Sequence, residues 1–185
     1  MEKLAIYGFG GFGRKIASII KRINDISPKW EIVGFFDDGI TSGAANRYGK
    51  VLGGMDELNN WPSQLNVIMV IALADILQKI IEKIKNLNIY FPNIIAPTVL
   101  FFDNPTVKIG KGNVICHSCR ISCDVSLGNF NLLNGGVSLG HDVKLGDLNV
   151  MQPDVRISRQ TSIGNANFFG VRSLGLQGLK IGNHT

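Results

Sequence analysis

The sequence has few cysteines, no long apolar run and no cluster of basic residues. Its three cysteines are an odd number, which favours a reducing, cytoplasmic compartment over a disulfide-bonded fold. The longest apolar run, residues 67–74, is too short to span a bilayer, and Met1 leads into a predicted strand rather than a signal peptide. The net charge of +5 is spread along the chain, so we expect phosphate-bearing small molecules as ligands rather than nucleic acid.

Glycine, by contrast, is abundant, with 22 residues, and some of these glycines mark a repeat. A segment ending in glycine recurs every 18 residues, at 108–110, 126–128, 144–146, 162–164 and 180–182. A large apolar residue recurs every six residues from Ile109 to Phe169. Three six-residue strands make one triangular coil, so this pattern predicts a parallel β-helix. Neither an α-helix nor simple alternation explains a strict period of six.

The repeat also predicts what lies inside the coils. An asparagine follows three residues after each of the first four glycines, and we expect these side chains to form one inward column, hydrogen-bonded from coil to coil. The glycines themselves suit a corner that needs a positive φ or a close approach. The expected column consists of Asn113, Asn131, Asn149 and Asn167.

The first part of the chain predicts a βαβ unit with a glycine-rich turn. A strand at residues 4–7 leads into a glycine loop and a helix at 14–23, and a second strand at 31–36 ends in two acids. The helix N-terminus offers N–H groups to a phosphate, and a carboxylate can accept from ribose hydroxyls or a base. A tight turn without a ligand is the alternative for the glycines, and a turn cap for the acids. The candidate binding residues are Gly8, Gly10, Gly11, Gly13, Asp37 and Asp38.

Further elements complete this α/β domain. We expect a short helix at 55–60, a strand at 67–72, a helix at 75–87 and a strand at 93–96. The isoleucines between Ile76 and Ile84 are expected to be core residues. The predicted fold class is therefore α/β plus all-β solenoid, with domains at 1–97 and 98–185.

One histidine stands out in the repeats. His141 lies two residues after Leu139, in an outward column with Cys123, Arg159 and Gln177. A neutral imidazole there can accept a proton, and Asp142 can orient it, so we take both as candidate catalytic residues. The alternative is a surface histidine with an acidic neighbour.

Asn134 is a second candidate in the repeats. It occupies a turn position that elsewhere holds glycine or serine. Its side chain can hydrogen-bond a substrate or His141. A structural role, as an asparagine in a left-handed turn, fits equally well.

The cysteines resemble a metal cluster only in sequence. Cys116, His117, Cys119 and Cys123 lie close along the chain, but the repeat phase points them in different directions. We therefore expect no metal site.

Several segments together carry a family resemblance: the loop at 8–14, the strand end at 34–38, the 95–97 segment, residues 133–136 and the Gly140-His141-Asp142 set. They resemble the hexapeptide-repeat sugar acyltransferases, specifically the sialic acid O-acetyltransferase and bacillosamine-pathway N-acetyltransferase family. The resemblance implies a left-handed β-helix and a homotrimer with active sites between neighbouring β-helices. It implies acetyl-CoA as cosubstrate and His141 as general base. It also implies that the Rossmann-like first domain holds the acceptor, a nucleotide-linked or sialic-acid-like sugar.

Two departures from the family pattern concern the donor side. Where some members place a second histidine nine residues after the catalytic one, this chain has Val150. The sequence stops inside a hexad at Thr185, so we expect either further coils or a partner at this end.

These observations predict an acetyltransferase that moves acetyl from acetyl-CoA to an amino or hydroxyl group of a sugar. N- and O-acetylation are both compatible with the residues. An NAD-dependent oxidoreductase, based on the glycine loop, is one alternative. A non-catalytic β-helix binding protein is the other.

Overall fold

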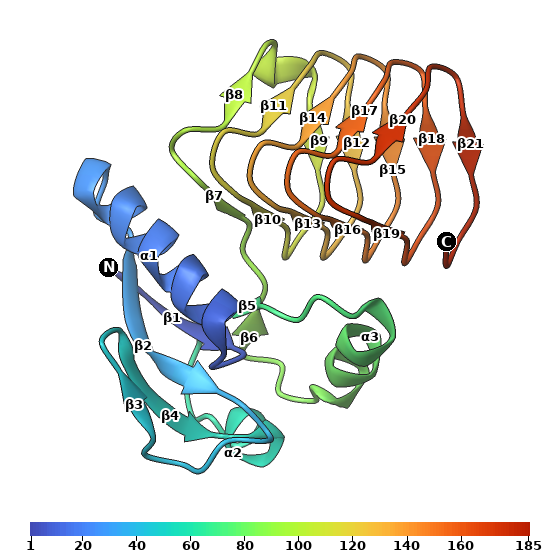
Figure 1. The fold of residues 1–185 in the computed structure, drawn as a ribbon. Coiled ribbons are helices and arrows are strands. Elements are labelled where there is room, and N and C mark those ends of the chain that lie inside the picture. Colours follow the sequence, from blue (N-terminus) through green and yellow to red (C-terminus); the bar gives the residue numbers. More distant parts are fainter. The chain divides into compact units, whose positions relative to one another are not determined.

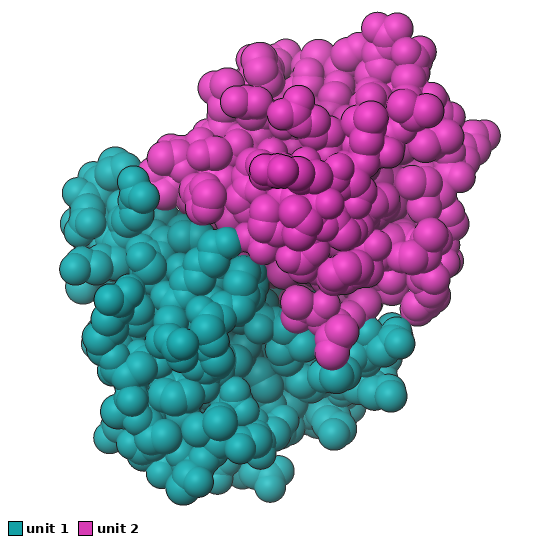
Figure 2. Space-filling view, in the orientation of Figure 1, with its two compact units in different colours: residues 1–71, 75–92 teal, residues 72–74, 93–185 magenta.

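A computed structural model describes residues 1–185, and the chain divides into two compact units (Figure 2). Unit 1 comprises residues 1–71 and 75–92, and unit 2 comprises residues 72–74 and 93–185. None of the helices has the length and apolar character that a bilayer span requires.

Unit 1 is built on a six-stranded sheet in the order β3-β4-β2-β1-β5-β6 (Figure 1). All neighbours pair in parallel except β3 and β4, which are antiparallel. The strands are β1 (Glu2–Tyr7), β2 (Trp30–Phe36), β3 (Ala45–Asn46), β4 (Gly49–Gly53), β5 (Leu65–Met69) and β6 (Ile89–Tyr90), and the helices are α1 (Gly11–Ile26), α2 (Met55–Asn59) and α3 (Ala74–Lys83). This arrangement confirms the predicted α/β domain.

Helix α1 packs on β1 and β2 through its apolar stripe. Ile16, Ile19 and Ile20 are buried, at the spacing that puts side chains on one helix face. The prediction for α3 was wrong in part. Leu77 is its buried residue, whereas Ile76 is 45% exposed, because a neighbour on the helix points about 100° away from the buried face.

Unit 2 is a stack of coils with three parallel sheets as its faces, which confirms the predicted β-helix (Figure 1). Each strand pairs with the strand one coil away. The first face is β7 (Ile94–Ile95), β10 (Val114–Ile115), β13 (Leu132–Leu133), β16 (Val150–Met151) and β19 (Phe168–Phe169). The second is β8 (Leu100–Phe101), β11 (Arg120–Ile121), β14 (Ser138–Leu139), β17 (Arg156–Ile157) and β20 (Leu174–Gly175). The third is β9 (Lys108–Ile109), β12 (Ser126–Leu127), β15 (Lys144–Leu145), β18 (Ser162–Ile163) and β21 (Lys180–Ile181).

The first coil begins earlier than the sequence suggested. Residues 93–96, predicted as a strand of the first domain, form β7, which pairs with β10 of the solenoid. Asn93 bonds Asn113, 20 residues away, whereas later partners are 18 apart. The extra length lies in the segment that holds the 3-10 turn η1 (Asn104–Thr106), and it hides the repeat phase of this coil. The solenoid therefore starts before the expected boundary at residue 97.

The buried asparagine column is confirmed. The Nδ2 atom of Asn131 lies 3.1 Å from Oδ1 of Asn113, and that of Asn149 lies 3.0 Å from Oδ1 of Asn131. The backbone N–H groups donate to the same oxygens, so each amide oxygen accepts two hydrogen bonds. Asn93 extends the column at one end, and the backbone of Thr185 extends it at the other. These bonds satisfy polar groups that would be costly to bury alone.

The corners use a left-handed residue in every hexad. Every sixth residue from Gly112 to His184 has a φ between 54° and 78°. The glycines of the repeat are not these residues, so of the two predicted alternatives, a positive φ and a close approach, the second holds. Their role is the close approach: a Cβ atom on Gly128 would lie 2.7 Å from the carbonyl oxygen of Gly146 in the next coil.

A second polar column, which the sequence did not reveal to us, lies beside these glycines. The backbone N–H of Asn129 donates to Oδ1 of Asp147, and that of Asp147 donates to Oδ1 of Asn165. The pattern continues from Asn165 to Asn183. This explains why both aspartate and asparagine occur at this repeat position: the side chains of both residues supply an Oδ1 atom that accepts the hydrogen bond.

Candidate functional site

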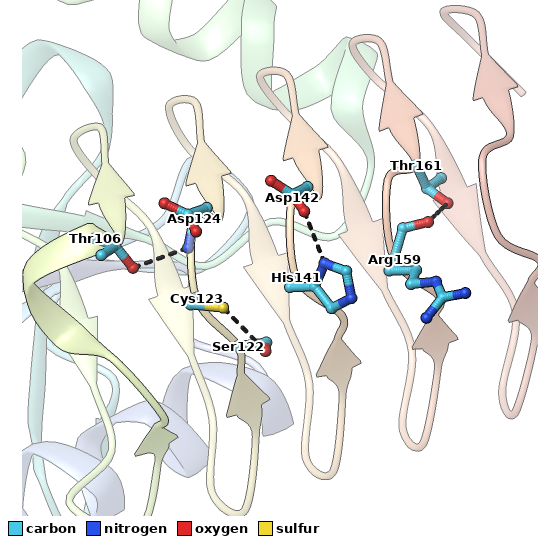
Figure 3. Close-up of polar contacts among 8 residues, drawn as sticks. All are labelled: Thr106, Ser122, Cys123, Asp124, His141, Asp142, Arg159 and Thr161. Atoms are coloured by element: carbon cyan, nitrogen blue, oxygen red, sulfur yellow. Dashed lines mark hydrogen bonds and ion pairs between the residues drawn. The ribbon is translucent and has the colours of Figure 1, made fainter.

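His141 lies at the corner between β14 and β15, and Cys123 and Arg159 lie on either side of it, at the same corner of the preceding and the following coil (Figure 3). We call residues 123–124, 141–142 and 159–160 the His141 corner. The three coils are tied by the backbone here: the N–H of Asp142 donates to the Cys123 carbonyl, and the N–H of Gln160 donates to that of His141. The column faces outward, as the repeat phase predicted.

His141 and Asp142 are in hydrogen-bond contact. Nδ1 of His141 lies 2.7 Å from Oδ2 of Asp142, and the two side chains are 41% and 51% exposed. Asp142 is one of the left-handed residues, with φ 60°, a conformation that aspartate tolerates better than most residues. The turn geometry thus directs the carboxylate back to the preceding imidazole.

This contact determines what the imidazole can do. A neutral His141 that donates its Nδ1–H to the carboxylate keeps a lone pair on Nε2. Because the ring is partly exposed, Nε2 is accessible to a substrate. When Nε2 accepts a proton, the adjacent carboxylate stabilises the imidazolium.

Asn134 lies at a different corner of the same coil. It precedes β14, whereas His141 follows it. Its Oδ1 accepts from the backbone N–H of Gly135, and its carbonyl accepts from the Cys119 thiol. These contacts account for Asn134 as a turn residue, and its expected role in substrate binding stays a prediction.

The glycine loop of unit 1 contains two kinds of glycine. Gly8 has φ 120°, and a Cβ on Gly13 would collide with the Gly8 carbonyl, so these two are required by the strand–helix packing. At Gly10 an added Cβ would meet nothing within 4 Å, and at Gly11 only the Arg14 side chain, 3.7 Å away. Gly10 caps α1 without a side-chain hydrogen bond, so no side chain at this position satisfies the first N–H groups of the helix.

The two strand-end acids are already bound within the chain. Asp37 accepts from the backbone N–H groups of Phe9 and Gly39, at 2.8 and 3.0 Å. Asp38 accepts from the hydroxyl of Tyr7 at 2.6 Å and from the N–H of Met55 at 2.8 Å. Both acids therefore hold the loops around the strand ends in place, and their expected role in ligand binding stays a prediction.

Tyr7 is the residue near these acids that the sequence reasoning missed. Burial raises the pKa of Tyr7, and its hydrogen bond to Asp38 raises it further. A tyrosine that ends a buried strand just before the glycine loop is the signal that could have identified it. It fixes the position of the Asp38 carboxylate.

A depression of about 330 Å³ lies beside the acids. Its lining combines carboxylates with small residues from the loop after β2 and from the start of α2. This volume falls near the lower limit for small-molecule sites. Among the lining residues are Asp37, Asp38, Ser42, Gly53, Gly54 and Asp56.

The three cysteine side chains do not lie together at one site. Cys116 and Cys119 are buried in the solenoid, whereas Cys123 is at the His141 corner. No group of three or more His, Cys, Asp or Glu side chains is placed to hold a metal ion. Val150 is buried on the first face, so the position nine residues after His141 offers no polar side chain.

Comparison with known families gave a match for the first domain. Residues 3–84 match the family model described as PglD N-terminal domain. A search of curated proteins found no match.

Comparison with solved structures gave matches along the whole chain. WeeI from Acinetobacter baumannii AYE matches with a TM-score of 0.81 and 19% identity, over 99% of this chain and 90% of that chain. The acetyltransferase domain of PglB from Neisseria gonorrhoeae FA1090, in complex with acetyl coenzyme A, has a TM-score of 0.62 and 23% identity, over 98% and 93%. A mutant of perosamine N-acetyltransferase from Caulobacter crescentus, in complex with CoA and GDP-perosamine, has a TM-score of 0.57 and 19% identity, over 95% and 91%. The resemblance inferred from the sequence is thus confirmed, and these structures share the fold of both units.

Proposed function

We propose that this chain, whose residues 3–84 match the PglD N-terminal domain, transfers acetyl from acetyl-CoA to an amino or hydroxyl group of a nucleotide-linked sugar. The observation that carries the proposal is the exposed pair of His141 and Asp142, 2.7 Å apart on the solenoid surface. The solved structures that share the fold include an acetyltransferase domain bound to acetyl coenzyme A and a mutant N-acetyltransferase bound to CoA and GDP-perosamine.

The proposed reaction is a direct transfer. The acceptor's amine or hydroxyl attacks the carbonyl carbon of the thioester, and Nε2 of His141 takes the proton. The C–S bond then breaks, and the CoA thiolate leaves and is protonated. Asp142 orients the ring and stabilises the imidazolium. No protein side chain becomes acetylated.

A backbone group is available for the oxyanion. The N–H of Arg159, one coil after His141, donates to no group of the chain. The glycine at position 140 leaves this N–H accessible. A Cβ on Gly140 would lie 2.6 Å from the Arg159 nitrogen and would block it. A preorganised N–H donor beside the base is what a tetrahedral intermediate of acyl transfer needs.

Unit 1 would hold the acceptor. The uncapped start of α1 and the open sides of Gly10 and Gly11 suit a phosphate group. The depression beside Asp37 and Asp38 suits the polar sugar or base of the same ligand. Both carboxylates are engaged with the chain, so their remaining lone pairs would contact the ligand.

We further propose a homotrimer with a left-handed β-helix and the reaction between neighbouring solenoids. A base that is 41% exposed in one chain would gain a water-excluding wall from a second chain. Molar mass from light scattering tests this assembly, and a monomer at assay concentrations would contradict it.

An acceptor screen tests the function. The purified chain is mixed with acetyl-CoA and a panel of UDP- and GDP-linked amino sugars, and release of free CoA thiol is followed. We expect acceptor-dependent release, with the product heavier by one acetyl group in mass spectrometry. NAD-dependent oxidation without CoA release would instead support the oxidoreductase alternative. Binding without turnover of any acceptor would support a non-catalytic protein.

A further inference from the structure

Arg159 is the cation of the His141 corner, and the proposed reaction has so far used only its backbone. It lies one coil after His141 in the same outward column, and its side chain projects from the same side of the solenoid (Figure 3). Neighbouring coils are about 4.8 Å apart. The backbone of Arg159 therefore lies about one coil spacing from that of His141, and its side chain is long enough to reach a ligand bound at His141.

The guanidinium has no anionic partner in the chain. The two ion pairs of the structure are His141 with Asp142 and Arg172 with Asp154, and Arg159 takes part in neither. The carboxylate of Asp142 is directed to the imidazole at 2.7 Å. Arg159 is thus an exposed, unpaired charge, although carboxylates are close in the sequence.

The backbone that carries Arg159 is fixed. Its carbonyl lies 3.5 Å from the hydroxyl of Thr161, which also donates to the carbonyl of Leu176 at 3.0 Å. Thr161 is fully buried, where the same position one coil earlier holds Val143. The backbone of Arg159 is therefore held in place, and its flexible side chain can reach a ligand.

Electrostatics gives the direction of the effect. The guanidinium places a positive charge at the His141 corner that no carboxylate of the chain pairs with. An anionic group of a substrate would pair with it, and such a charge-assisted contact is stronger than a hydrogen bond between neutral groups. Arg159 therefore suits a ligand that brings its own negative charge to the corner.

We propose that Arg159 binds an anionic group, a carboxylate or a phosphate, that a substrate carries close to the reacting centre. This makes Arg159 a specificity-determining residue for substrates with such a group. The anion belongs to the acceptor, because the pantetheine arm holds the CoA phosphates far from the thioester carbonyl; a guanidinium binds a carboxylate or a phosphate with the same chemistry. The inference rests on the proposed acetyl transfer.

The test compares Arg159→Gln and Arg159→Lys with a matched control, Arg120→Gln, which removes the same charge from an exposed position on the second face. Acceptors are N-acetylneuraminic acid, its methyl ester and a UDP-linked amino sugar. Donors are acetyl-CoA and S-acetyl-N-acetylcysteamine, which has no phosphate. Both kcat and KM are measured for each pair that reacts.

We expect Arg159→Gln to lower kcat/KM about ten- to a hundredfold for the anionic acceptors, with partial recovery in Arg159→Lys and no change in Arg120→Gln. A loss seen with both donors supports an anion on the acceptor, whereas a loss seen only with acetyl-CoA would place Arg159 against the distant CoA phosphates and would overturn the proposal. Equal kinetics of Arg159→Gln and wild type with every pair would overturn the proposal.

A binding measurement separates this failure from failure of the function. If wild type acetylates none of the acceptors, the proposed function fails on its own. Titration calorimetry of acetyl-CoA and of N-acetylneuraminic acid against wild type and Arg159→Gln then decides on Arg159. A Kd for N-acetylneuraminic acid that is weakened about tenfold in the variant supports the anion site, and unchanged or absent binding of this ligand refutes it.

Discussion

Nδ1 of His141 lies 2.7 Å from Oδ2 of Asp142, and the contact spans adjacent residues at one corner of the β-helix. The left-handed conformation of Asp142, φ 60°, turns its carboxylate towards the ring that precedes it. The pair therefore depends on the repeat, because every sixth residue adopts this conformation.

Asp142→Asn should lower kcat for acetyl transfer about ten- to a hundredfold, because an amide no longer stabilises the imidazolium by charge. Asparagine tolerates the left-handed conformation, so the fold should be retained. The control is Asp124→Asn, at the same position one coil earlier with φ 57°. Steady-state kinetics of both variants are the measurement, and equal rates would remove Asp142 from the mechanism.

Gly128→Ala should destabilise the solenoid by about 2 kcal/mol, because the new Cβ meets the backbone of the next coil. Gly182 occupies the same repeat position, but an added Cβ there has nothing within 4 Å. Gly182→Ala should therefore have little effect. Denaturant unfolding of the two variants measures the difference. Equal stability would mean that the coils separate easily at this corner.

Asn149→Ala should cost about 3 kcal/mol of stability, because buried groups in two adjacent coils lose their partners. Its Nδ2 donates to Asn131 at 3.0 Å and to the Gly164 carbonyl at 2.9 Å. Asn165→Ala, in the exposed second column, should cost less. Thermal unfolding followed by circular dichroism tests the order, and a reversed order would contradict the role assigned to the buried column.

Gly13→Ala and Gly10→Ala should separate folding from binding in unit 1. The first places a Cβ against the Gly8 carbonyl and should lower the melting temperature of unit 1. The second meets no atom of the chain, so it should leave the fold intact while weakening binding of a nucleotide sugar about tenfold. Calorimetric titration with a UDP-sugar is the measurement. Unchanged affinity in Gly10→Ala would place the ligand elsewhere.

The period of six was enough to predict the solenoid, its inward residues and the outward position of His141. It worked because each hexad has the same geometry, so phase alone fixes which way a side chain points. The same reasoning failed where the geometry changes. The first coil contains extra residues around η1, so Ile94 and Ile95 do not follow the 18-residue spacing of the later coils. For this reason β7 was predicted as a strand of unit 1.

Other features depend on contacts that no local pattern encodes. The left-handed positions hold residues as different as Phe130, Leu148 and Arg172, so composition does not reveal them. The burial of Leu77 rather than Ile76 depends on how far α3 turns towards its neighbours. The hydrogen bond from Tyr7 to Asp38 joins residues 31 apart in the sequence.

The most direct test of the account is the kcat of His141→Ala beside that of His117→Ala, an exposed histidine at a different corner of the preceding coil. Both variants are compared with wild type for CoA release with an accepted sugar, after circular dichroism and light scattering have shown the same fold and assembly. We expect His141→Ala to lose about a thousandfold in kcat and His117→Ala to keep wild-type turnover. Wild-type turnover in His141→Ala would contradict the assignment of the general base.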